Sequence, residues 1–101
     1  MPTLRVDLQE GFQDDTVTVW VGDEELQRSH VSTRLQTGYA GSLEVQVQEG
    51  AADVEVALPS RGTSKSIPVA FGGADTVYLG LSVVSGDEIS ARVSHRPFRY
   101  L

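Results

Sequence analysis

Apolar and polar residues alternate along most of the chain with a period of two, as in β-strands that bury one face. The clearest example is the segment 43–58, LEVQVQEGAADVEVAL, where the alternation runs on both sides of the short stretch 49–53. Gly50 lies in that stretch and favours a tight turn. The pattern therefore predicts two strands paired as an antiparallel hairpin.

Alternation also predicts strands elsewhere in the chain, at 4–8, 16–21, 24–28, 67–71, 77–84 and 89–93. Gly-Asp pairs at 22–23 and 86–87 are typical of tight hairpin turns. The short, charged strand 24–28 and the strand that contains Pro68 are expected at sheet edges, because charges and proline oppose further pairing. The segment 77–84 is partly apolar on both faces, which favours a central strand.

No segment of helical length shows a 3.6-residue period, and turn signals separate strands at regular intervals. These features predict an all-β, antiparallel, two-sheet β-sandwich of immunoglobulin-like or prealbumin-like type. It has eight or nine short strands and no significant helix. The length of 101 residues fits a single domain, 1–101. The stretch VTVWVGDEEL resembles hairpins of prealbumin-like and carboxypeptidase regulatory-like domains, but the likeness extends no further and assigns no family.

The composition narrows the classes of partner and compartment. The chain has no cysteine, and therefore no disulfide framework and no thiolate metal site. Arg5 and Asp7 interrupt the N-terminal stretch where a signal peptide needs an apolar core. No apolar run approaches the roughly 20 residues of a membrane span. We therefore expect a cytoplasmic protein without a membrane partner.

The charge is acidic and unevenly distributed. Fourteen carboxylates against eight basic side chains give a net charge of −6, which argues against nucleic acid as a partner. Residues 1–60 carry eleven acids and three bases, whereas residues 61–101 carry three acids and five bases. Such a division can orient a partner or favour head-to-tail self-association, but surface charge usually serves solubility, and we interpret it as an ordinary solvated surface.

Trp20 is the residue that most suggests a binding function. It alternates with Val19 and Val21 and therefore lies on the polar side of its strand, where an aromatic ring can anchor a protein or stack on a sugar. The candidate binding residues are Trp20, Tyr78, Phe98 and Tyr100. In the alternative interpretation the C-terminal segment PFRYL covers Trp20, or its ring fills the hollow over a glycine such as Gly80.

Signals for catalysis and metal binding are weaker. The acidic loops Asp14–Asp15, Asp23–Glu25 and Asp87–Glu88 contain calcium-type ligands, but none has the spacing of a specific calcium motif. A hydrolase that uses Ser29, Ser32 or His30 would need His30 or His95 beside a carboxylate, and no nucleophile motif supports it. The predictions are therefore no enzyme, no catalytic residue, no metal and no cofactor.

The leading hypothesis is a non-enzymatic interaction module that acts by protein–protein contact. The partner is another protein, or a second copy of the chain in a homodimer paired through a sheet edge. The alternative is a carbohydrate or small-ligand binding module with Trp20 as the stacking platform.

Overall fold

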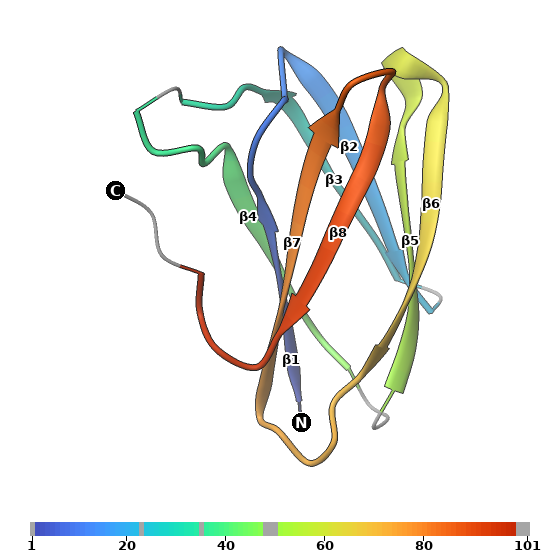
Figure 1. Ribbon diagram of the computed structural model, residues 1–101. Coiled ribbons are helices and arrows are strands. Elements are labelled where there is room, and N and C mark those ends of the chain that lie inside the picture. The colour runs from blue at the N-terminus through green and yellow to red at the C-terminus, as the bar shows by residue number, and fades with distance from the viewer. Residues whose placement is uncertain (1, 23, 35, 48–50, 99–101) are drawn as a thin grey trace.

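The computed structural model describes residues 2–22, 24–34, 36–47 and 51–98, and consists almost entirely of β-strands (Figure 1). The elements in chain order are β1 Thr3–Leu8, β2 Asp15–Val21, β3 Glu24–Val31, β4 Gly41–Gln46, β5 Ala51–Leu58, the short 3-10 turn η1 Pro59–Arg61, β6 Thr63–Ala70, β7 Thr76–Val84 and β8 Glu88–Ser94. None of the described residues forms a helix long and apolar enough to span a membrane.

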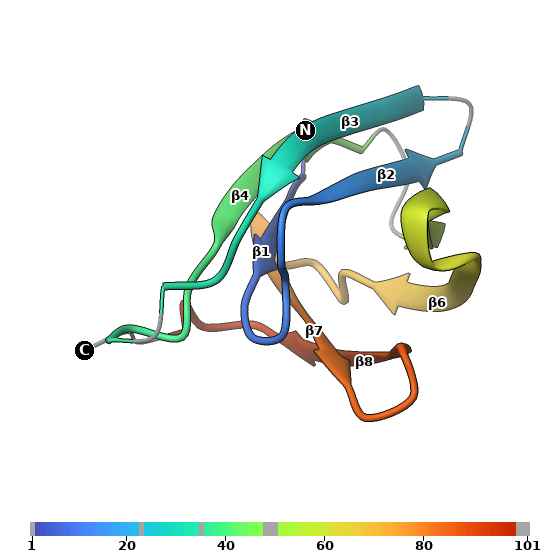
Figure 2. The ribbon, with the colours of Figure 1, turned by 90° about the horizontal axis from the view of Figure 1, so that it is seen from above.

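The strands form two four-stranded sheets packed face to face, so the predicted two-sheet β-sandwich is confirmed (Figures 1 and 2). The first sheet has the order β4-β1-β7-β8, and the second has the order β3-β2-β5-β6. One pairing departs from the predicted antiparallel arrangement, because β1 runs parallel to β7. A parallel pair needs a long connection, and here five strands separate its two members in the chain.

The core lies between the sheets and is built from the apolar side of every strand. The largest fully buried side chains are Phe71, Leu4, Leu8, Leu58, Leu79, Leu81, Val6, Val17, Val19, Val54, Val56 and Val69. All except Phe71, which follows β6, lie in strands, and their spacing of two within each strand explains why alternation identified the strands. The outer faces of both sheets consequently carry the polar half of the pattern, and any binding surface must be assembled there or at the edges.

The predicted hairpin over 43–58 is wrong. Strand β4 pairs with β1 in the first sheet, whereas β5 pairs with β2 and β6 in the second. The chain crosses from one sheet to the other between the two strands; residues 48–50 lie outside the described residues. Alternation identifies which face of a strand is buried but not which strand is its neighbour. Two strands that face each other across a core therefore have the same pattern as a hairpin.

The predicted positions of three other strands are confirmed. Strand β7 is central, between β1 and β8, and strands β3 and β6 are the two edges of the second sheet. Strand β3 extends to Val31, beyond the predicted end at Arg28. The turn at 22–23 joins β2 to β3 because Val21 pairs with Glu24, and Gly22 has a φ of 60°.

Both open sides of the sandwich are bridged by a cation on an edge strand of the second sheet. Arg28 on β3 pairs with the buried Val17, and Lys65 on β6 pairs with the buried Val56, so both project toward the interior side. Arg28 Nη1 donates to the carbonyl oxygen of Ser42 on β4 at 2.9 Å. Lys65 Nζ donates to that of Ile89 on β8 at 3.2 Å. Inward-pointing charge is a known device against edge-to-edge pairing.

Candidate functional site

Trp20 lies on the outer face of the second sheet, as its alternation predicts, and is partly buried. The register places Glu25 of β3 directly across from it on one side and Glu55 of β5 directly across on the other. Side chains at such paired positions have Cβ atoms about 4.5–5.5 Å apart. The indole therefore lies between two carboxylate-bearing neighbours, both of which are exposed.

The surroundings of Trp20 on this face are polar and acidic. We call the outer face of the second sheet the Trp20 face; its residues on the four strands include Thr18, Trp20, Glu25, Gln27, Asp53, Glu55, Ala57, Ser64, Ser66 and Pro68. The charged members of this set are all carboxylates. Thr18, two residues from Trp20, is only 4% exposed although it faces outward. A row with negative charge on both sides of an aromatic ring favours a cationic group as its partner.

The other aromatic residues predicted for the site are not beside Trp20. Tyr78 is on β7, in the first sheet, and faces outward between its paired residues Arg5 and Ser94. Phe98 packs on Arg92 of β8, also in the first sheet, with the guanidinium carbon 4.8 Å from the ring centroid. Tyr100 lies outside the described residues. The sandwich thus separates Trp20 from Tyr78 and Phe98 by its full thickness.

The two suggested covers for Trp20 are wrong where the structure describes them. The segment after β8 turns back along the first sheet (Figure 1), and Phe98 lines the same cavity as Thr37 and Gly38 of the loop between β3 and β4. The hollow over Gly80 is filled by the Gln9 side chain, because a Cβ at Gly80 would lie 2.7 Å from Gln9 Nε2. Both features are on the first sheet, whereas Trp20 belongs to the second.

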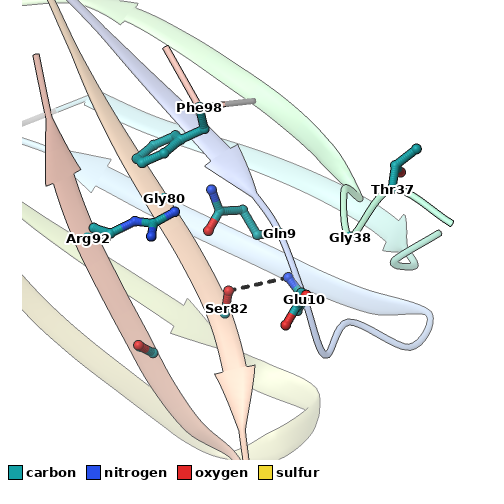
Figure 3. Close-up of a pocket in the computed structure, with 9 residues that line it drawn as sticks. Gln9, Glu10, Thr37, Gly38, Gly80, Ser82, Arg92 and Phe98 are labelled. Carbon is teal, nitrogen blue, oxygen red and sulfur yellow. Dashed lines mark hydrogen bonds between the residues drawn. The ribbon is translucent and has the colours of Figure 1, made fainter. Parts of the chain in front are cut away.

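A polar cavity of about 360 Å³ opens on the outer face of the first sheet, and sequence reasoning missed it (Figure 3). Its lining residues are Gln9, Glu10, Thr37, Gly38, Gly80, Ser82, Ser90, Arg92 and Phe98. Ser82 pairs with Ser90, and Gly80 pairs with Arg92, so the outer face of β7 and β8 forms one wall of the cavity. The polar alternation of these strands was visible in the sequence, but the contact between Arg92 of β8 and Phe98 of the C-terminal segment was not.

An ion-pair network joins the start of β2 to η1, which follows β5, and to the turn between β7 and β8 in the other sheet. Arg61 donates from Nε to Asp15 Oδ1 and from Nη2 to Asp15 Oδ2, each at 2.9 Å. It also donates to Asp87 Oδ1 at 2.8 Å and to the carbonyl oxygen of Gly11 at 3.0 Å. The Asp15 side chain is 3% exposed and that of Arg61 is 19% exposed. Two acids from the predicted calcium-type loops are therefore engaged by a guanidinium.

The network shifts the acid–base behaviour of both partners. Burial acts to raise the pKa of Asp15, but hydrogen bonds from Arg61, the Gln13 amide and Ser60 outweigh it and hold the pKa below its usual value. The hydrogen bond to Asp15 in turn raises the pKa of the Arg61 guanidinium. Asp15 therefore stays ionised in the folded protein at a pH where it begins to protonate in the unfolded chain.

This shift predicts a loss of stability in acid. Because the folded pKa of Asp15 lies below the unfolded value of about 3.9, its stabilisation is present above that pH and is lost as the pH falls through the folded pKa. We expect the free energy of unfolding to fall below about pH 4, and to fall less steeply in Asp15→Asn. Urea denaturation at a series of pH values measures both slopes. Parallel profiles for the two proteins would contradict the assignment.

His30 is brought beside a carboxylate, as the hydrolase hypothesis requires. Its Nδ1 lies 2.8 Å from Asp14 Oδ1, and Ser32 Oγ accepts a hydrogen bond from the Asp14 amide at 2.8 Å. However, the His30 and Asp14 side chains are 85% and 76% exposed. Nucleophilic catalysis needs a hydroxyl held against the imidazole and a site that excludes water, and this open pair provides neither. That the protein is not an enzyme stays a prediction.

Within the described ranges, no three histidine or acidic side chains gather in a way that would hold a metal ion. Asp14 pairs with His30, while Asp15 and Asp87 pair with Arg61; Asp23 lies outside the described residues.

Comparison with protein-family models, with curated protein sequences and with solved structures finds no match to this chain.

Proposed function

We propose that the protein is a non-enzymatic interaction module that contacts a protein partner through the Trp20 face. The observation that carries this proposal is the position of Trp20: a partly buried tryptophan in the middle strands of a sheet, between Glu25 and Glu55. Tryptophan at the centre of a polar surface is the residue type most enriched in interface hot spots. The surrounding polar side chains match the rim of such an interface.

The chemistry of the face specifies the partner as a basic segment. A lysine or arginine side chain laid on the indole gains a cation–π interaction, and the flanking carboxylates add charge complementarity. Asp53, one row further along β5, extends the acidic surface in the same direction. Glu25, Asp53 and Glu55 are three of the eleven acidic residues among residues 1–60.

The face is a better candidate than the edges. Arg28 and Lys65 already donate to edge carbonyl groups of β4 and β8, and Pro68 lacks the amide that an added strand would need. An edge-paired homodimer has to displace these groups before it gains any backbone hydrogen bonds. A partner that lies across the Trp20 face meets no such obstacle.

The single tryptophan provides the test. We expect a tetra-arginine peptide to quench or shift the fluorescence of Trp20 in a saturable way, and a tetra-glutamate peptide to have no effect. Because both carboxylates are removed without a change of shape, Glu25→Gln/Glu55→Gln should weaken the binding about tenfold, or about 1.4 kcal/mol. Trp20→Ala, followed by calorimetry, should abolish it. Glu88→Gln, on an exposed position of β8, is the matched control and should bind as the wild type does.

Two results would overturn the proposal. One is equal binding of tetra-arginine by the wild type and by Trp20→Ala, which would make the attraction general to an acidic protein. The other is saturation of the fluorescence change by neutral oligosaccharides and not by the peptide. That result would favour the alternative function, a carbohydrate-binding module with Trp20 as the stacking platform.

A further inference from the structure

The polar cavity on the first sheet has the features of a built ligand site, independent of the Trp20 face. The side chains of Phe98, Arg92 and Gln9 converge over Gly80, and Glu10 and Ser82 close the side toward the β1–β2 loop (Figure 3). Its volume of about 360 Å³ is at the lower end of the range of small-molecule pockets. We call this cavity the Phe98 cavity.

Arg92 supplies a positive charge that is oriented but not neutralised. Its guanidinium carbon lies over the Phe98 ring, 4.8 Å from the ring centroid, and among the described residues Arg92 forms no ion pair. A guanidinium placed over a ring keeps the N–H groups that point away from the ring available. Two parallel N–H groups match the two oxygens of a carboxylate, and this match is the strongest recognition that an arginine offers.

The rest of the wall is rich in hydroxyl groups. Ser82 and Ser90 face each other on paired strands, and Ser82 Oγ accepts a hydrogen bond from the Glu10 amide at 3.3 Å. That bond leaves the Ser82 hydroxyl proton available for donation. Thr37 Oγ1 is buried in the opposite wall and has no hydrogen-bond partner among the described residues. Because this oxygen is closed off from the cavity, it takes no part in ligand recognition, and the accessible polar groups of the wall are those of Ser82, Ser90 and Glu10.

We propose that the Phe98 cavity binds a sugar acid, a polyhydroxylated ring that carries one carboxylate. The carboxylate pairs with Arg92, and ring hydroxyls exchange hydrogen bonds with Ser82, Ser90 and Glu10. Glu10 accepts from hydroxyls but repels negative charge, so it selects against multiply charged anions such as phosphate esters. A monosaccharide acid fits the size of the cavity, and Phe98 offers the rim of its ring as an apolar wall.

The test is titration of the full chain with glucuronic acid, followed by NMR amide shifts. We expect saturable shifts confined to the neighbourhood of Gly80, Ser82 and Ser90. Glucose and acetate each lack half of the recognised groups, and each should bind at least about tenfold more weakly. Arg92→Gln keeps a polar side chain of similar direction but removes the charge, and should lose the binding. Arg96→Gln, an exposed arginine outside the lining, is the matched control and should retain it.

Several outcomes would overturn the proposal. Absence of saturable shifts with glucuronic acid would exclude a sugar-acid site, and equal affinity for glucose would exclude the role of Arg92. Acetate binding as tightly as glucuronic acid would mean a simple anion site without hydroxyl recognition. Trp20→Ala should leave the shifts unchanged, because Trp20 is on the opposite sheet. This site and the proposed protein-binding function can therefore fail separately.

Discussion

Arg61→Ala is expected to lower the free energy of unfolding by about 3 kcal/mol, the largest loss that we predict for a single change outside the apolar core. A domain of this size has a total of about 5–15 kcal/mol. The melting temperature should accordingly fall by roughly 10–20 °C. Chemical denaturation at neutral pH, checked by a thermal scan, measures the loss.

The reason is the carboxylate that the mutation leaves behind. Asp15 is 3% exposed, and both of its oxygens accept hydrogen bonds from Arg61. Without the guanidinium, an ionised group stays buried with only the Gln13 amide and Ser60 as donors. Removing one partner of a buried ion pair destabilises the fold more than replacing both partners with apolar residues, because the remaining charge is desolvated and unpaired.

Asp87→Asn is the matched control. It removes the other carboxylate that Arg61 contacts, but the Asp87 side chain is 56% exposed, and exposed ion pairs contribute about 0–1 kcal/mol. We expect a loss below about 1 kcal/mol for Asp87→Asn. The double variant Arg61→Ala/Asp15→Asn should lose less than the sum of its single variants, because the buried charge is gone. A loss for Arg61→Ala as small as that for Asp87→Asn would show that water replaces the guanidinium freely.

The sandwich itself was predictable from the sequence because a single physical rule builds it. Residues such as Val17, Val19, Leu79 and Leu81 are buried on alternate positions, and the same period is legible in the chain. Which strands lie next to each other in a sheet does not follow from this period. Strands β4 and β5 are neighbours in sequence and have matching patterns, yet they belong to different sheets. Their separation depends on the summed contacts of all eight strands, which no local pattern records.

For the candidate site, the sequence predicts the direction of a single side chain but not its neighbours in space. The outward direction of Trp20 follows from its two valine neighbours, and the structure agrees. The expectation that other aromatic residues gather near it had no local basis, and Tyr78 and Phe98 lie on the other sheet. The partners that do flank Trp20, Glu25 and Glu55, come from strands on either side in the sheet. Only the register identifies them, and the register is a property of the whole sheet.

The strand register also shows which side chains protect the edges of the sandwich. It predicts that their removal changes the oligomeric state. We expect Arg28→Thr/Lys65→Thr to self-associate at micromolar concentrations at which we expect the wild type to be monomeric. Threonine favours strands but cannot reach the carbonyl oxygens of Ser42 and Ile89, which Arg28 and Lys65 now occupy. Those edge groups then become available to a second copy of the chain. Sedimentation velocity over a range of concentrations measures the association.

The control must distinguish the loss of the two edge hydrogen bonds from the loss of two positive charges. Arg34→Thr/Arg96→Thr also removes two cations, and both arginines are exposed outside the strands. Both double variants carry the same more negative net charge, so repulsion between copies is equal and only the edge variant should associate.

The free energy of unfolding of the edge variant should fall by about 1 kcal/mol per lost hydrogen bond, or about 2 kcal/mol, because each donor lies at the rim of the core. If the edge variant stays monomeric, the cations do not guard the edges. If the wild type is already a dimer and Arg28→Thr/Lys65→Thr leaves it intact, the dimer forms through a surface that contains neither residue, and the two cations do not control assembly.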